Sequence, residues 1–430
     1  MFKKNLLRSA LLASASALLL TACFESPNDS GDAGNADSVS VPVDYAFLDS
    51  NGASTVVYTG QTARLLLIHD IQTAARAGRG ASAPITAGSI LKYYYNRDTD
   101  SLDILASVGS FTRFHTKYAQ IQGGRYLDDK ISPAVVIGYG VTADSLVKRW
   151  AAQLAANSQD AGKRANEEAY LDSNGMDLSQ MISKVLAGAV AYYQASEIYF
   201  KDITTRNNTA LVTGTNYTEM EHRWDEAFGY FGASRDHLSK YTDSNFVSQT
   251  TSFKDANTDG KIDFRSEYNF SMMGRYTARR DLLLPGQDWN GDAFRAFVKG
   301  RALITGKKST AAIAAQRDIA LRVWDDVYAS NVISYIKNVK GKLATDSSTT
   351  RIGVSGAWSE LKAFAVCLQF NSARKISDAD LLKLQNWIGH GPKLKGADRV
   401  EYLNKLDSAQ ALVKSVYGFS DAQVNAGSWL

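Results

Sequence analysis

Oxygen-bearing side chains alternate around one glycine in the stretch "DANTDGKIDFRSEYNF", residues 255–270. Calcium loops need carboxylate or amide oxygens at alternate positions, a glycine for the sharp turn, and a backbone carbonyl just after it. The candidate ligands are the side chains of Asp255, Asn257, Asp259, Asp263 and Glu267 and the backbone carbonyl of Lys261. Calcium is the expected ion because every donor is a hard oxygen.

One departure separates this loop from the common calcium pattern. The twelfth position of the loop holds Ser266, and Glu267 follows one residue later. The glutamate therefore reaches the ion only if the next segment starts differently from a standard loop–helix junction. The sequence predicts a structural calcium site in residues 255–267, and the competing interpretation is a polar turn capped by Asp263.

A second candidate site lies in "TEMEHRWDEAFGYFG", residues 218–232. At about 100° per residue, the large apolar side chains form one stripe, and His222, Asp225 and Glu226 fall on the opposite face. These three positions are three and four residues apart, so they share one patch of a helix. An imidazole with two carboxylates is a donor set for iron or zinc. The competing interpretation is a bundle helix whose polar face is solvated or hydrogen-bonded.

Common hydrolase signatures are absent from the sequence. It contains no His-Glu-x-x-His, no Gly-x-Ser-x-Gly and no phosphate-binding loop. The remaining histidines have no recognisable partners, and we expect structural or surface roles for His69, His115, His237 and His390. No catalytic residue and no organic cofactor are therefore predicted.

The start of the chain resembles a bacterial lipoprotein signal. Residues 1–22 combine three cations with an apolar run at 10–20, which is shorter than the roughly 20 residues of a membrane-spanning helix. The run ends in "LTAC", which predicts lipidation of Cys23 and attachment to a membrane through lipid alone. Phe24 follows the cysteine instead of an aspartate, which favours the outer membrane. Residues 23–40 are rich in Ser, Asn, Asp and Gly and predict a disordered tether.

Charge and cysteine content exclude two classes of protein. The 430-residue chain has a formal charge of +4, which falls to +1 once the three cations of the signal are removed. That value gives no basic footprint for nucleic acid. With Cys23 lipidated, Cys367 is the one remaining cysteine, so no intramolecular disulfide is expected. Cys367 lies in the apolar run "FAVCLQF" and is expected to be an inert core residue.

Helical periodicity dominates after residue 60. We expect helices at about 61–78, 141–158, 177–204, 216–232, 264–282, 291–303, 309–341, 355–371, 378–388 and 396–416. Asp177, with Gln180 three residues later, predicts a capped helix start. Residues 45–60 alternate around an Asn-Gly turn and predict a short β-hairpin. Long helices joined by loops predict an all-α protein of two helical bundles, at 41–245 and at 246–430, with the calcium loop between them.

Several motifs together resemble a known family. They are the lipobox, "VVYTGQTARL", "HRWDEAFGYFG", "DANTDGKIDFRSEYNF" with "ARRD" after it, and "WSELKAF". This combination resembles the bacterial lipoprotein family catalogued as domain of unknown function 4856. That family is distantly similar to imelysin-like proteins, which are double helical bundles of the cell envelope linked to iron uptake and once proposed to be peptidases. Their Gly-x-His-x-x-Glu motif is only approximated here, since Met220 replaces the glycine and Glu226 lies four residues after His222.

The sequence and the resemblance lead to one functional expectation. We expect a lipid-anchored, non-enzymatic envelope protein, stabilised by calcium, with an iron-uptake or metal-binding accessory role and an outer-membrane uptake receptor as its partner. The alternatives are a metal-dependent peptidase of imelysin type and a pure interaction scaffold.

Overall fold

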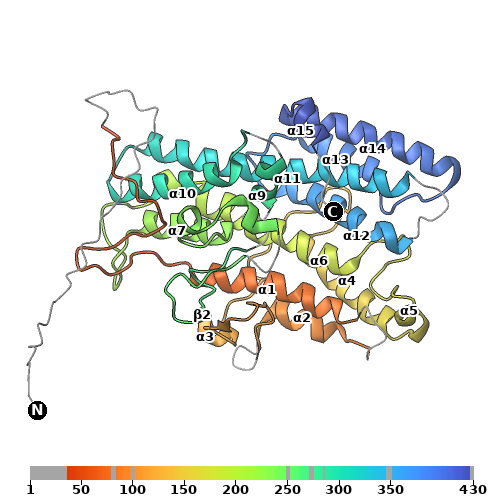
Figure 1. The fold of residues 1–430 in the computed structure, drawn as a ribbon, viewed down its shortest axis with the longest axis horizontal. Helices are drawn as coiled ribbons and strands as arrows, with labels where there is room; N and C mark the ends of the chain where they lie inside the picture. Colours follow the sequence, from red (N-terminus) through yellow and green to blue (C-terminus); the bar gives the residue numbers. More distant parts are fainter. Residues whose placement is uncertain are drawn as a thin grey trace, which may run out of the picture.

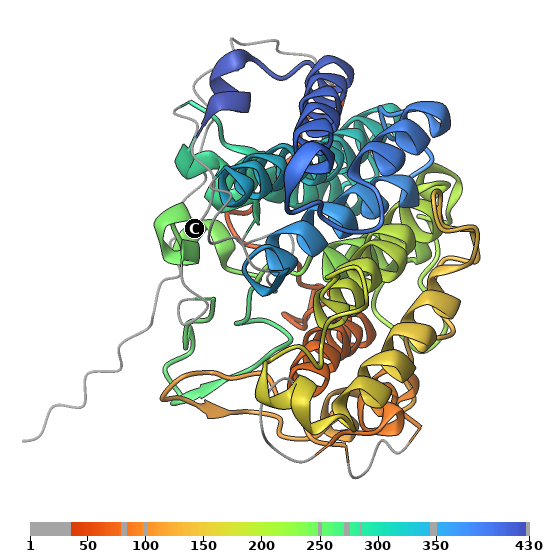
Figure 2. The same cartoon turned by 90° about the vertical axis from the view of Figure 1, so that its right-hand side faces the viewer.

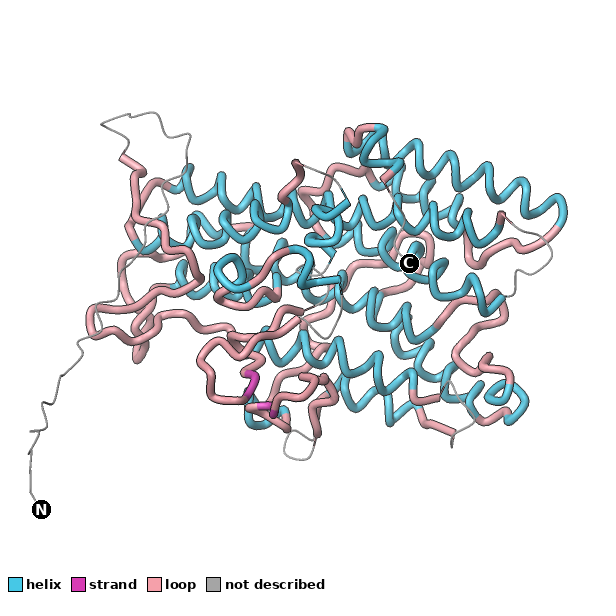
Figure 3. The backbone as a smooth tube through the Cα atoms, in the orientation of Figure 1, coloured by secondary structure: helices cyan, strands magenta, loops and turns pink. Residues whose placement is uncertain are grey.

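The computed structural model describes residues 36–78, 84–97, 102–247, 252–270, 276–283, 286–344 and 351–426. Cys23, the predicted signal and most of the predicted tether lie outside the described residues. Helices make up most of the described chain (Figure 3), and the prediction of an all-α fold is confirmed. Among the described helices, none combines the length and the apolar character needed to cross a membrane.

The first half of the chain contains short and medium helices. Their bounds are α1 (Thr59–Arg76), α2 (Ala87–Tyr95), α3 (Tyr118–Gln122), α4 (Ala143–Ser158), α5 (Ala161–Ala165), α6 (Leu178–Leu186), the π-helical segments η1 (Ala187–Tyr192) and η2 (Gln194–Phe200), the 3₁₀ turn η3 (Ile203–Thr205), α7 (Glu219–Phe231), α8 (His237–Lys240) and the 3₁₀ turn η4 (Asp243–Val247).

The second half contains the longest helices. Their bounds are α9 (Tyr276–Leu283), α10 (Trp289–Thr305), α11 (Thr310–Leu343), α12 (Arg351–Cys367), the 3₁₀ turn η7 (Leu368–Phe370), α13 (Asp378–Ile388), α14 (Gly396–Tyr417) and α15 (Asp421–Asn425). Two short strands, β1 (Thr112–Arg113) and β2 (Lys261–Ile262), pair in parallel and join the loop after α2 to the predicted calcium loop.

The helices are stacked from one side of the molecule to the other (Figures 1 and 2). In both views α1, α2 and α4 form the lower side, and α11 and α14 form the upper side. Between them, α6 packs on α1, α4 and α12, and α12 packs in turn on α11. One buried hydrophobic cluster runs through this stack from Tyr45 to Val424. The two halves thus share one core, and the division into two bundles at residue 245 stays a prediction.

The centre of the stack contains an unusual helix. After α6 the backbone continues through η1 and η2 with i to i+5 hydrogen bonding, which widens the helix. Gly188 in η1 lies so close to α12 that a Cβ atom there would stand 2.6 Å from the sulfur of Cys367. Cys367 is fully buried, as predicted, and burial raises the pKa of its thiol to about 12. The π-helical stretch ends beside α7 and so places Tyr199 near the start of α1.

Two local predictions can be compared directly with the structure. Asp177 caps α6 by accepting hydrogen bonds from the backbone N–H groups of Ser179 and Gln180, which confirms the predicted helix start. The predicted hairpin at 45–60 is reduced to a tight turn with one antiparallel bridge, between Leu48 and Ser54.

The helix predicted at 264–282 is wrong in its first part, and the short helices α2, α3, α5, α8 and α15 were not predicted. Residues 264–270 are not helical, because the chain there turns back and Tyr268 bridges antiparallel to Phe253. The longest of these is α2, whose start Thr86 caps.

Candidate functional site

The candidate site forms where α1 begins against the side of α7. Thr218 and Glu221 make a reciprocal capping box that starts α7, and Gly232 ends it in the left-handed conformation at φ +78°. Gly229 lies on the face of α7 toward α1. A Cβ atom at Gly229 would stand 2.7 Å from Cβ of Tyr58 and 2.9 Å from Cβ of Gln61. Only glycine allows this close approach, so Gly229 positions the start of α1.

The close approach brings together polar side chains from three elements. The amide nitrogen of Gln61 in α1 donates to the carboxylate of Glu226 in α7 over 2.9 Å and to the hydroxyl of Tyr199 in η2 over 3.3 Å. His222 lies one turn before Glu226, with Nε2 3.8 Å from a carboxylate oxygen. The ring of Tyr217 stacks on the His222 imidazole with centroids 4.8 Å apart. The structure therefore brings two of the three predicted transition-metal ligands into one polar site.

A cavity of about 450 Å³ opens beside these contacts. This volume is typical of pockets that receive small organic molecules. Its polar lining includes Tyr58, Gln61, Arg64, Gln122, Arg125, Asp129, Lys130, Tyr199, Tyr217, His222 and Glu226. Three cations thus face the cavity against two carboxylates.

The two arginines of the lining have no acidic partner in the part of the chain that the structure describes. Among the described residues, neither Arg64 nor Arg125 has a carboxylate within ion-pairing distance. Arg64 is 4 % exposed, and its guanidinium donates to backbone carbonyls, at 2.9 Å to that of Tyr126. Burial, together with the negative charge of Glu226, raises the pKa of Tyr199, so this phenol stays a neutral hydrogen-bonding group.

Asp225, the third predicted transition-metal ligand, takes part in a buried ion pair instead. It is fully buried and lies between Tyr45, whose hydroxyl donates to it over 2.7 Å, and Arg301, whose Nε donates over 2.9 Å. Arg301 also pairs with Glu221 over 2.8 Å. Although burial opposes the charge, these two carboxylates raise the pKa of Arg301. Asp225 therefore joins α7 to α10 through a buried ion pair and is not among the side chains that line the cavity.

The first half of the predicted calcium loop folds around its glycine. Asp255 accepts hydrogen bonds from the backbone N–H groups of Asp259 and Gly260 over 3.1 and 2.8 Å, and Asn257 accepts from Asp259 over 3.0 Å. Asp259 accepts from the N–H of Lys261 over 2.8 Å. The side chains of Asp255 and Asn257 are thereby turned toward the Asp259–Gly260 bend, where φ of Gly260 is +78°.

The second half of the loop uses its carboxylates in other contacts. Asp263 pairs with the guanidinium of Arg265, at 2.7 Å, and lies 3.7 Å from Nδ1 of His115. Glu267 is 4 % exposed and accepts hydrogen bonds from the N–H groups of Ala256 and Asp263, which tie the two ends of the loop together. Calcium binding by all six predicted donors stays a prediction.

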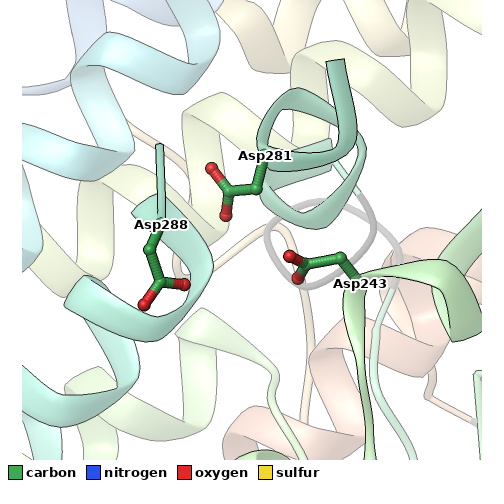
Figure 4. A group of neighbouring side chains, drawn as sticks. All are labelled: Asp243, Asp281 and Asp288. Atoms are coloured by element: carbon green, nitrogen blue, oxygen red, sulfur yellow. The ribbon is translucent and has the colours of Figure 1, made fainter. Parts of the chain in front are cut away.

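A third acidic group was not predicted from the sequence. Asp243, Asp281 and Asp288 lie around a common space, with one oxygen of each within 4.8 Å of the others (Figure 4). Asp281 accepts the N–H groups of Trp289 and Asn290 over 2.9 and 2.7 Å, and Asp288 caps α10. Burial and the charges of Asp243 and Asp288 raise the pKa of Asp281 to about 7. We interpret this group as the anchor of the start of α10.

Most of the cavity was not predicted from the sequence. His222 and Glu226 were predicted to lie together, since their spacing is local to one helix. No role was predicted for Gln61, Arg64 or Tyr199, although the first two lie in the "TGQTARL" motif. One feature of the motif could have indicated a binding site. The motif begins a helix, and Tyr58 before it provides no side chain that caps the first backbone N–H groups.

The fold and the cavity define the protein as an all-helical protein with a polar pocket between α1 and α7. A family model described as a domain of unknown function (DUF4856) matches residues 42–386, and the chain belongs to this family. No curated protein and no solved structure matches the chain. The distant similarity to imelysin-like proteins stays a prediction.

Proposed function

We propose that this protein is a lipid-anchored, non-catalytic binding protein of the bacterial envelope, whose cavity between α1 and α7 receives a small polar ligand. The observation that supports this proposal is the cavity of about 450 Å³, where polar groups from α1, η2 and α7 converge. Convergence of polar groups in one concave site is the usual mark of a small-molecule site.

The same geometry favours an organic ligand over a bare transition-metal ion. His222 and Glu226 supply two donors, whereas zinc sites commonly take at least three protein ligands. The nearby guanidinium groups of Arg64 and Arg125 repel a free cation. The donor set therefore gives little support to a metal-dependent peptidase. An iron-related role fits this cavity better if the iron arrives inside an organic chelate.

The proposal also includes a structural calcium ion and a location in the cell envelope. The orientation of Asp255, Asn257 and Asp259 around the Gly260 bend supports a structural calcium ion in the loop. Such an ion would hold β2, and through it β1, against the body of the protein. Lipidation at Cys23, attachment to the outer membrane and an uptake receptor as partner are carried by the sequence pattern alone.

The test is to recover the mature protein from the membranes of its own host and to weigh it by native mass spectrometry. Val57 is half-buried and lines the cavity, so Val57→Trp fills part of it. Val135 is 56 % exposed and is not among the lining residues, so Val135→Trp is the matched control. We expect a small molecule on the wild type and on Val135→Trp that is lost from Val57→Trp. The same molecules on all three proteins would contradict the proposal.

A further inference from the structure

Two arginines at the cavity wall have no carboxylate counter-charge among the described residues. Arg64 is 4 % exposed, and Arg125 is half-buried. Among the described residues, the ion pairs of the protein leave both without a carboxylate partner. A buried charge without a partner is costly, and proteins normally pair it or use it to hold a ligand. Since both side chains line the cavity, an anion there would supply the missing counter-charge.

The start of α1 adds unused hydrogen-bond donors at the same wall. Tyr58, the residue before α1, provides no side-chain cap. Within the described chain, no acceptor is bonded to the backbone N–H groups of Thr59 and Gly60. Gly60 faces the guanidinium of Arg125, since a Cβ atom there would stand 2.9 Å from its Nε. The positive end of an 18-residue helix and an arginine thus lie next to each other at the cavity.

Glu226 on α7 supplies an acceptor to the same cavity. Glu226 receives one hydrogen bond, from Gln61, and its other oxygen lies 3.8 Å from His222. A carboxylate with spare acceptor capacity in a polar cavity suits a hydroxyl or amino group that donates to it. The lining therefore combines cations and backbone donors at the start of α1 with a carboxylate acceptor on α7, and Asp129 adds a second carboxylate.

We propose that the ligand of this cavity is a small hydroxylated organic anion. Its carboxylate or phosphate lies between Arg64, Arg125 and the first N–H groups of α1, and a hydroxyl group donates to Glu226. This inference rests on the proposed function, because it names the chemical class that the same cavity takes. It goes beyond that function in assigning the charge of the ligand and its orientation.

The test compares three probes that share one sugar ring. Glucuronate carries a carboxylate, glucose 6-phosphate carries a phosphate, and glucose carries neither. Dissociation constants of all three are measured by isothermal titration calorimetry on the full mature chain at low salt. We expect at least one of the two anions to bind at least tenfold more tightly than glucose. The stronger of the two identifies whether the acidic group is a carboxylate or a phosphate.

Variants assign this preference to the cavity. Arg125→Gln removes one cation at a half-buried position, and we expect it to weaken the anion at least tenfold while leaving glucose unchanged, as loss of a charge-assisted hydrogen bond does. Lys405→Gln is the matched control, since Lys405 pairs with Glu401 on the exposed surface of α14 and its removal costs the same unit of charge. Circular dichroism checks that both variants are folded.

The outcomes separate this inference from the proposed function. If glucose binds as tightly as the anions, or if Arg125→Gln binds them as the wild type does, the inference is overturned and the cavity remains a site for neutral ligands. If no probe binds, the inference is overturned as well. The Val57→Trp comparison on the native protein then decides separately whether the cavity binds any ligand.

Discussion

Lys362 offers a prediction whose size follows from the structure. Its side chain is fully buried in α12, donates to the backbone carbonyl of Gln385 over 3.1 Å, and lies 5.2 Å from the ring centre of Tyr139. Burial lowers the pKa of this amine from 10.5 to about 7. The unfolded chain therefore binds more protons than the folded chain between about pH 7 and pH 10.5, and stability must rise with pH across that window.

The magnitude follows from the two pKa values. A depression from 10.5 to about 7 corresponds to at most about 5 kcal/mol of lost stability when both states are protonated. Between pH 6 and pH 9 the free energy of unfolding of the wild type gains about 2.5 kcal/mol from this group. Lys362→Met keeps the shape of the side chain and removes the titrating amine. It also removes the hydrogen bond from the amine to the Gln385 carbonyl, at a cost of about 1.5 kcal/mol, while that carbonyl keeps its bond from the N–H of Gly389 at 2.9 Å.

We therefore expect Lys362→Met to stabilise the protein by roughly 3 kcal/mol at pH 6 and to be nearly neutral at pH 9. Urea unfolding at the two pH values measures the difference. Lys405→Met, at a side chain that is 46 % exposed, is the control and should change little at either pH. A Lys362→Met variant that is equally destabilised at pH 6 and pH 9 would contradict this expectation, because the amine would then be charged and well paired in the folded protein.

Four further predictions concern other parts of the chain. Gly229→Ala should lower the free energy of unfolding in urea by about 1–3 kcal/mol, because the added methyl group overpacks α7 against α1. Gly356→Ala is the control, since a Cβ atom there meets nothing within 4 Å, and it should stabilise the protein by about 0.5–1 kcal/mol. Equal effects of the two substitutions would contradict the close packing of Gly229. Calcium at tenfold excess over its dissociation constant should stabilise the protein by about 1.4 kcal/mol and raise its melting temperature, an effect that Asp255→Ala abolishes; a melting temperature unaffected by calcium after chelation would leave only a polar turn. Because the pKa of Asp281 is raised to about 7, the free energy of unfolding of the wild type should fall as pH rises from about 4 to 7. Asp281→Asn should therefore become more stable relative to the wild type between pH 5 and pH 8, and a constant difference in free energy of unfolding would contradict this. Cys23→Ser should release the protein from membranes, and retention of the variant after a salt wash would exclude lipid anchoring.

Capping residues and apolar periodicity predicted those helices whose bounds are determined within one segment of the chain. The long helices α11, α13 and α14 fall within two residues of their predicted bounds, because capping residues and apolar periodicity act within one segment. α2 was missed since its short "AGSILKYYY" sequence is rich in tyrosine, which favours strands. Phe264 and Tyr268 have helical spacing, yet pairing with a distant segment overrides it.

The candidate site was likewise predicted only where its residues lie close together in the sequence. The spacing of His222 and Glu226 predicted one shared patch, and the structure brings both to the cavity. Asp225 has the same local spacing, but it pairs with Arg301, a residue that the sequence places far away and the fold brings to 2.9 Å. The helical pattern gives the face of α7 only approximately, and partners such as Arg301 decide which residues on that face are accessible.

The most direct measurement is a crystal structure of the mature chain isolated from its own host, without added ligand. We expect density for a small organic molecule in the cavity, with an acidic group at Arg64 and Arg125 and a hydroxyl at Glu226. A cavity that holds only ordered water would contradict this expectation, whether or not a molecule is bound elsewhere on the protein.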